Sequence, residues 1–223
     1  NQDWPTYRHD AGRTGCASTE LPTKLTQAWS TKLPDSAVKS AVVAAGRVFV
    51  AGRDSHAIYA LDASTGDILW HFTADGPIDS PPTIHDGAAI FGCSDGWIYA
   101  VRVTDGALAW RFRAAPSDIR IVAYGRIESP WPVHGSVLVR DGIVYAVSGR
   151  TSQLDGGMKL LKIEASTGKV ILEKPIPAGL SDVLLAQGDN LFLRHKRMNL
   201  EGDPLPANIP HLYSPAGLLD DDW

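Results

Sequence analysis

The sequence predicts an all-β protein, a β-propeller built from four-stranded antiparallel blades. An eleven-residue pattern at 60–70 recurs at 100–110 and, more weakly, at 162–172. Between these copies, short alternating runs are separated by turn residues, as in antiparallel strands. A period of about 40 residues with four runs per copy is typical of a propeller, because one such sheet cannot bury both faces alone.

The elements follow in order along the chain. An irregular arm, residues 1–26, carries the aromatic residues Trp4 and Tyr7 and is expected to wrap over a preformed surface. A strand is expected over 25–33. Its Trp29 lies 41 residues before Trp70, so it resembles the closing strand of a repeat.

Three full copies and part of a fourth come next. The strands expected are 38–45, 47–51, 57–62 and 67–72; then 80–85, 88–92, 97–102 and 107–113; then 136–140, 143–148, 158–164 and 169–173; then 182–186 and 190–194. The predicted division is an arm (1–26), blades (27–200: one closing strand, three full blades and half a blade) and a Pro-rich tail (201–223) that continues into missing blades. We therefore expect a partial ring, about half of a seven- or eight-bladed propeller.

The eleven-residue pattern is expected to fasten one blade to the next. Its turn needs a left-handed residue, which glycine supplies, and short polar side chains bond the turn amides. Small alanines leave room for a tryptophan from the adjacent blade, whose burial contributes at most about 5 kcal/mol. The residues assigned to docking are Ala60, Asp62, Thr65, Gly66, Trp70, Ala100, Gly106, Trp110, Gly168 and Trp29.

The pattern Ala60-x-Asp62-x-x-Thr65-Gly66-x-x-x-Trp70 resembles the tryptophan-docking motif of the pyrroloquinoline-quinone-type propeller repeat. That family includes quinoprotein alcohol dehydrogenases and cofactor-free propeller lipoproteins of outer-membrane protein assembly. The arm, from Trp4 to Asp10, resembles the segment before the first blade in secreted bacterial members of planctomycete type. The resemblance to the cofactor-free branch implies an exported protein, periplasmic or extracellular and associated with the cell envelope.

The resemblance also raises quinone chemistry as an alternative. Quinone enzymes of the family carry an adjacent-cysteine disulfide, a Trp floor and calcium ligands. Cys16 and Cys93 are not adjacent, and either two free thiols or one disulfide fits their number. Trp97 and Trp131 could each form the floor under the cofactor or simply pack between the blades. Glu128, Asp79 and Asp155 are carboxylates that could bind calcium in principle, but no calcium-loop motif is present.

Candidate contacts for a ligand or partner lie on one face of the propeller. Loops between second and third strands, and the connections between blades, share this face and hold both insertions (114–134 and 149–157). Variable loops on a rigid scaffold often bind partners. The alternative is that their polar groups pair with each other and close the loops. The candidates are Arg53, Asp54, Asp79, Arg126, Glu128, Trp131, His134, Arg150 and Asp155.

Composition limits the functions further. Net charge is −4 without a basic run, which argues against nucleic acid, and no apolar stretch is long enough for a membrane span. No catalytic or metal-binding motif is recognisable. We expect a non-catalytic, cofactor-free exported scaffold that binds a protein partner or the remaining blades, with a carbohydrate or small molecule as a further ligand. The alternatives are the N-terminal half of a dehydrogenase that uses pyrroloquinoline quinone and calcium, and an accessory or sensory propeller of a larger multi-domain protein.

Overall fold

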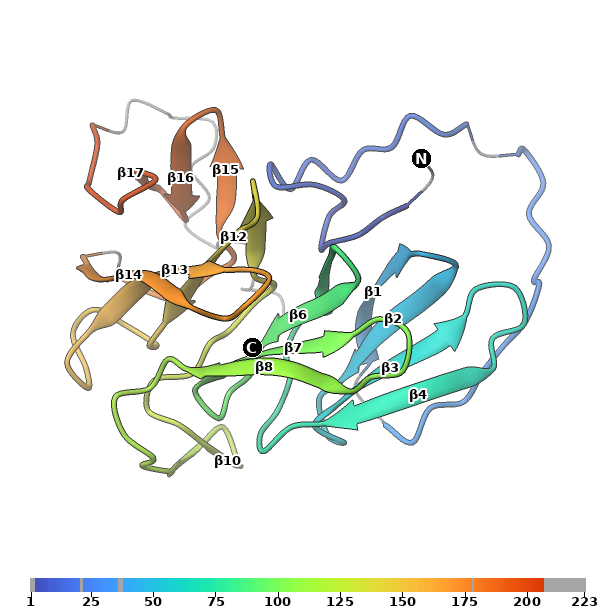
Figure 1. Cartoon of the computed structure of the whole chain (residues 1–223), viewed down its shortest axis with the longest axis horizontal. Coiled ribbons are helices and arrows are strands. Elements are labelled where there is room, and N and C mark those ends of the chain that lie inside the picture. Colours follow the sequence, from blue (N-terminus) through green and yellow to red (C-terminus); the bar gives the residue numbers. More distant parts are fainter. Residues whose placement is uncertain (1–2, 21, 36–37, 178, 207–223) are drawn as a thin grey trace.

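Four antiparallel sheets stand side by side in chain order in the computed structural model (Figure 1). The structure describes residues 3–20, 22–35, 38–177 and 179–206, and these residues form no helix. The expected all-β class, with several four-stranded antiparallel sheets, is therefore confirmed.

Three sheets are complete four-stranded meanders in which each strand pairs with the next along the chain. Their strand bounds differ from the predicted bounds by at most three residues. The strands are β1 (Val38–Ala44), β2 (Arg47–Gly52), β3 (Ala57–Asp62) and β4 (Ile68–Thr73); β5 (Thr83–His85), β6 (Ala88–Gly92), β7 (Trp97–Arg102) and β8 (Leu108–Arg113); β11 (Leu138–Arg140), β12 (Ile143–Ser148), β13 (Met158–Glu164) and β14 (Val170–Ile176).

Three differences from the sequence prediction concern individual strands. The insertion before the third sheet forms an unpredicted hairpin, β9 (Ile121–Ala123) and β10 (Arg126–Glu128). The fourth sheet has three strands instead of two: β15 (Leu185–Gln187), β16 (Asn190–Leu193) and β17 (Lys196–Asn199). Strand β17 carries one apolar residue and so lacks the expected alternation. The predicted strand at 25–33 does not form, and most of its side chains are exposed.

The tail extends the fourth sheet a little further. Pro204 forms an isolated bridge with Met198, and the Leu205 amide donates to the Arg197 carbonyl at 2.9 Å. Residues 207–223, most of the predicted tail, lie outside the described residues.

The hydrophobic core lies between successive sheets. One cluster joins the first and second sheets around Phe49, Ile58 and Phe91, and another joins the second and third around Ile90 and Leu161. A third cluster joins the third and fourth sheets. The second and third sheets therefore bury their two faces against different neighbouring sheets, as a propeller requires.

Three tryptophan rings lie against the turn glycine of the sheet that follows them. Trp70 contacts Gly106, and its Nε1 donates to the Val103 carbonyl at 3.0 Å. The other two pairs have the same geometry: Trp29 on Gly66 with a bond to Ala63, and Trp110 on Gly168 with a bond to Ala165. The glycines thus have a second role beyond shaping the turn, because a Cβ on Gly106 would lie 2.6 Å from the Trp70 ring.

The junction between the third and fourth sheets uses different chemistry. Leu172 stands where the pattern has tryptophan, and the turn at Gly202 packs against Leu160 instead. Lys162, in the position of Ala60 and Ala100, pairs with Glu201 at 3.0 Å. Ion pairs and aliphatic packing replace the indole at this junction.

The N-terminal arm lies against the first strands of the sheets. It runs between the first and fourth sheets in Figure 1. Its backbone bonds β1 at Val43, β5 at Ile84 and β15 at Ala186. The Arg13 side chain, 4% exposed, reaches the third sheet as well, through the carbonyls of Ser136 and Val137. The arm therefore joins all four sheets on one side.

The hydrogen bonds of the Arg13 guanidinium go to neutral oxygen atoms. Its Nε donates to the Leu184 carbonyl at 3.1 Å, and Nη1 donates to Thr6 Oγ1 at 2.7 Å and to the Tyr7 carbonyl at 2.9 Å. Burial lowers the pKa of Arg13 to about 10, so the group stays charged at neutral pH.

Gly106→Ala should be far more destabilising than Gly87→Ala. Both glycines have positive φ, 72° and 75°, but only Gly106 has a ring against it, and Gly87 has open space. The backbone conformation alone costs about 1–2 kcal/mol, and displacing the Trp70 ring adds about 1–3 kcal/mol. Urea unfolding of both variants measures the difference, and equal losses would contradict the role of the indole contact.

Arg13→Met should lower the free energy of unfolding by about 2–4 kcal/mol, because it removes the Arg13 donors from the buried carbonyls of Ser136 and Leu184. Arg13→Lys should recover only part of this loss, since a lysine lacks the planar fork. Arg8→Met is the matched control, because Arg8 is exposed on the same arm. Chemical denaturation followed by tryptophan fluorescence gives the three values. A loss in Arg8→Met as large as in Arg13→Met would contradict the assignment.

Candidate functional site

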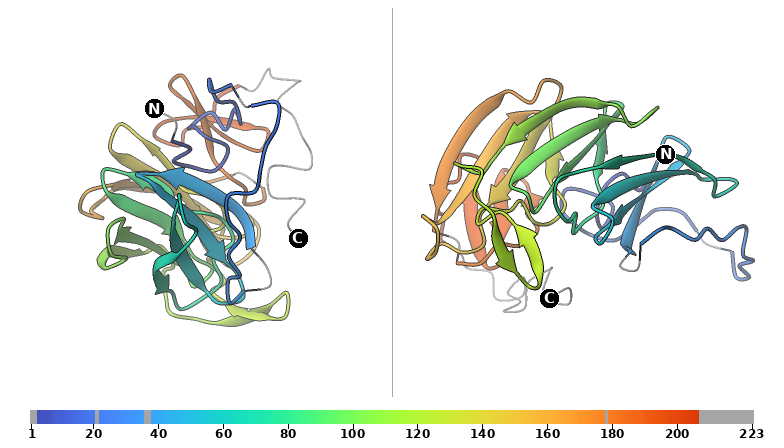
Figure 2. Two further views of the ribbon diagram at one scale, coloured as in Figure 1. Left: turned by 90° about the vertical axis from the view of Figure 1, so that its right-hand side faces the viewer. Right: turned by 90° about the horizontal axis from the view of Figure 1, so that it is seen from below.

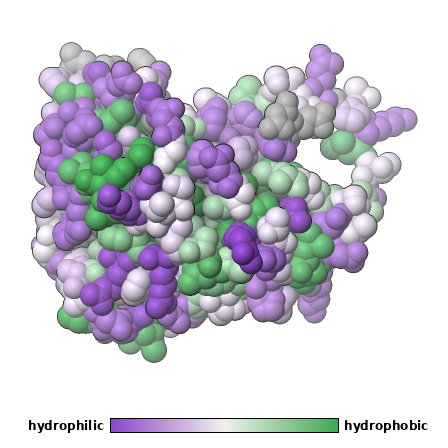
Figure 3. All heavy atoms as spheres, in the orientation of Figure 1, coloured by the Kyte–Doolittle hydropathy of each residue, from purple (hydrophilic) through white to green (hydrophobic). Residues whose placement is uncertain are grey.

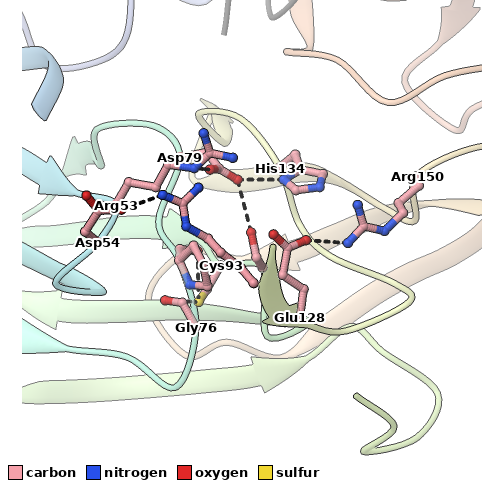
Figure 4. A network of polar contacts seen from close by, with 11 residues as sticks. Arg53, Asp54, Gly76, Asp79, Cys93, Glu128, His134 and Arg150 are labelled. Atoms are coloured by element: carbon pink, nitrogen blue, oxygen red, sulfur yellow. Dashed lines mark hydrogen bonds and ion pairs between the residues drawn. The ribbon is translucent and has the colours of Figure 1, made fainter. Parts of the chain in front are cut away.

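Most of the charged residues proposed from the sequence lie together in one group of loops (Figure 4), and Arg126 joins them through its ion pair with Asp54. We call the following seven the polar loop network: Arg53, Asp54, Asp79, Arg126, Glu128, His134 and Arg150. They come from the β2–β3 loop, the β4–β5 connection, the inserted hairpin and its exit, and the β12–β13 loop. The strand-to-strand connections therefore gather residues that lie up to 97 positions apart, from Arg53 to Arg150.

Asp79 is the centre of one half of the network. Its carboxylate accepts from His134 Nδ1 at 2.7 Å and from Ser94 Oγ at 3.0 Å, and lies 2.9 Å from Arg53 Nε. Burial alone would raise the pKa of Asp79, but the hydrogen bond from His134 and the charges of His134 and Arg53 outweigh it and hold the pKa at about 2.

The other half consists of two more ion pairs. Arg150 Nη2 binds Glu128, which is only 1% exposed, and Arg126 Nη2 binds Asp54 across the loops. The remaining two candidates also contact each other, because Trp131 Nε1 donates to the Asp155 carbonyl. The polar groups thus pair with one another, as the second interpretation of the sequence expects.

The inserted hairpin is fixed at its base and exposed at its tip. The amides of Ser129 and Val133 bond the carbonyls of Ser94 and Cys93 in the second sheet. Beyond this base, β9 and β10 stand out from the sheets, in yellow-green in Figure 2. The hairpin bears exposed apolar side chains: Val122 is 78% exposed, Tyr124 70% and Ile127 66%.

Val122 and Ile127 are cross-strand partners and so share one face of the hairpin. In Figure 3, apolar atoms lie at the lower edge, where Figure 1 places β10. A short pattern was present in the sequence: Ile121 and Val122 precede a Tyr-Gly turn that is followed by Ile127. The sequence prediction omits this hairpin because the 40-residue repeat does not include these residues.

The described residues do not fit a quinone with its calcium ion. The guanidinium of Arg111 covers one face of the Trp97 ring, 4.5 Å from its centroid, and Trp131 Nε1 is bonded to the Asp155 carbonyl in the β12–β13 loop. Within the described ranges, no three His, Cys, Asp or Glu side chains are gathered as metal ligands.

The cysteines add nothing to such a site. Cys16 is exposed and Cys93 is buried, and both are free, so the disulfide alternative is wrong. Burial raises the pKa of the Cys93 thiol, which keeps it protonated at neutral pH.

A cavity of about 360 Å³ adjoins the polar loop network. His134 and Arg150 contribute to its wall, together with residues that sequence reasoning did not select, among them Thr151, Ser181 and Arg194. Two of these, Ser181 and Arg194, belong to the part of the chain where the repeat is incomplete. No local motif marks them, because only the fold brings the fourth sheet beside the β12–β13 loop.

Asp79 should contribute to stability above its unfolded-state pKa, near 4, and lose this contribution as pH falls toward 2. The shift corresponds to about 2–3 kcal/mol. The difference in unfolding free energy between wild type and Asp79→Asn should therefore shrink by about that amount between pH 5 and pH 2. Urea titrations at several pH values measure it. Asp86→Asn, at an exposed turn, is the control, and a pH-independent difference for Asp79→Asn would contradict the pairing.

Comparison with known proteins places these features in a family. The family profile described as "Outer membrane protein assembly factor BamB", a PQQ-type repeat, matches residues 24–154 and 94–202. The outer membrane protein assembly factor BamB of Yersinia pestis is 26% identical over 128 residues, 56% of this chain and 32% of that protein. The quinoprotein ethanol dehydrogenase of Pseudomonas aeruginosa is 28% identical over 177 residues, 70% of this chain and 26% of that protein.

Solved structures support the propeller fold. The quinohemoprotein alcohol dehydrogenase ADHIIG of Pseudomonas putida HK5 superposes with a TM-score of 0.61 at 17% identity, over 78% of this chain and 26% of that one. The matched segment thus spans about a third or less of the length of these three proteins. Within the described residues, no helix is long and apolar enough to cross a membrane. The family profile covers most of the sequence, and the chain belongs to the BamB-type family of PQQ-repeat proteins.

Proposed function

We propose that the chain is a non-catalytic, cofactor-free, exported scaffold that binds a polypeptide partner through its inserted hairpin. The observation that carries the proposal is the exposed pair Val122 and Ile127 on a hairpin that stands out from the sheets. A two-stranded hairpin is marginally stable alone, and a contiguous exposed apolar patch is a common mark of an interaction site.

The surroundings of the hairpin support a binding role. The hairpin is held at its base by backbone bonds and by the Arg126–Asp54 and Arg150–Glu128 pairs. These contacts position its tip without covering it, which lowers the cost of ordering it on binding. The name of the relatives, outer membrane protein assembly factor, agrees with a partner that is a protein of the cell envelope.

A dehydrogenase function is the weaker candidate. The match to the quinoprotein ethanol dehydrogenase covers 70% of this chain, but the described residues lack a gathered set of metal ligands. Dye reduction measured after addition of pyrroloquinoline quinone and Ca²⁺ tests this alternative. Clear turnover would overturn the non-catalytic assignment.

A photocrosslinking residue at position 124, at the hairpin tip, should form a discrete adduct with a cell-envelope protein. The same residue at position 86, an exposed turn away from the hairpin, should not. Val122→Ser with Ile127→Ser should abolish the adduct from position 124 while changing the unfolding free energy by less than about 0.5 kcal/mol, because both side chains are exposed. Equal adducts from both positions, or an adduct that survives the double substitution, would refute binding through the hairpin.

A further inference from the structure

The cavity beside the polar loop network has a rigid frame. The β12–β13 loop and the β14–β15 connection are bonded to each other along its wall. Thr151 forms a bridge with Leu180, and the Ser181 amide donates to the Arg150 carbonyl at 2.9 Å. The side chains of these residues therefore converge on the cavity from a fixed backbone, as in preformed ligand sites.

Two residues of the wall each carry a buried polar atom that lacks a hydrogen-bond partner among the described residues. The two atoms are Ser181 Oγ, on a residue that is 7% exposed, and Arg150 Nε. In the Arg150 guanidinium, Nη2 donates to Glu128 and to the Ser129 carbonyl, whereas Nε has no acceptor in the described part of the chain. Leaving such groups unpaired is costly, so their position at a cavity indicates an absent partner.

The chemistry of the wall defines that partner. An arginine Nε–H is a donor only, and a serine hydroxyl can donate as well, so both are satisfied by oxygen acceptors. Arg194 adds a second guanidinium, and none of the described residues that line the cavity is acidic. Leu154 and Leu180 form an apolar part of the wall. Together these features favour an oxyanion attached to an apolar body.

We propose that this cavity binds a small organic anion, with its carboxylate or phosphate oxygens on Arg150 Nε and Ser181 Oγ and its apolar body against Leu154 and Leu180. The volume, about 360 Å³, lies in the range of small-molecule sites. Tyr124 of the hairpin also lines the cavity, whereas Val122 and Ile127, the proposed contact pair for a polypeptide, do not. Occupation of the cavity does not depend on a polypeptide partner, and the two proposals can fail independently.

The test uses three probes of similar size on the purified chain. Phenylacetate carries a carboxylate, phenyl phosphate carries a phosphate, and benzyl alcohol is the neutral control. We expect at least one of the anions to bind, with benzyl alcohol weaker by about tenfold or more. The anion with the higher affinity shows whether the site prefers a carboxylate or a phosphate. Isothermal titration calorimetry, with chemical-shift mapping of Ser181 and Leu180, measures affinity and location.

Variants locate the anion within the cavity. Arg150→Lys keeps a positive charge for Glu128 but has no Nε–H in this position, and it should weaken anion binding by about tenfold. Ser181→Ala should weaken it several-fold. Arg140→Lys, at a surface ion pair with Asp189, is the matched control and should bind as wild type does. Absence of binding by both anions at about 10 mM, equal binding of benzyl alcohol, or unchanged affinity in both cavity variants would each overturn the proposal.

Discussion

The contact between an indole ring and a left-handed glycine holds the sheets in register. At Gly106 the backbone has φ 72° and the Trp70 ring occupies the space of the missing Cβ. The indole N–H then bonds a carbonyl three residues before the glycine, at Val103. One residue type thus meets two demands at once, a turn conformation and a close approach, and the same solution recurs at each of three junctions. Where Leu172 replaces the tryptophan, charged side chains such as Lys162 hold the fourth sheet.

Most of the fold was predictable because its determinants are local and repeated. Alternation and Asp-Gly or Thr-Gly turns mark β6, β7, β12 and β13 with the bounds observed. The failures occur where that local pattern is absent. Strand β17 has only one apolar residue, and the hairpin β9–β10 lies outside the repeat. The segment around Trp29 forms no strand and contacts the first sheet through the Trp29 indole, which bonds the Ala63 carbonyl.

The candidate site was predictable in position but only partly in detail. The alternation of strand direction assigns the loops to two faces, which is why residues as distant as Asp54 and Arg126 meet as expected. Their pairing geometry, and the participation of Ser181, depend on side-chain packing between sheets. The sequence contains no periodic signal for either, since each contact joins loops of different length.

The path of the arm has a consequence for the order of assembly. The bond from Arg13 to the Leu184 carbonyl joins residues 171 positions apart, and the bonds to Ser136 and Val137 span 123 and 124 positions. Such contacts close very long loops, so they reward folding only after the intervening sheets exist. During synthesis the arm emerges before these four sheets, yet the surface that it binds exists only after they have formed. The arm therefore docks only after the four sheets that follow it in the chain have formed, and its contacts hold these sheets together afterwards.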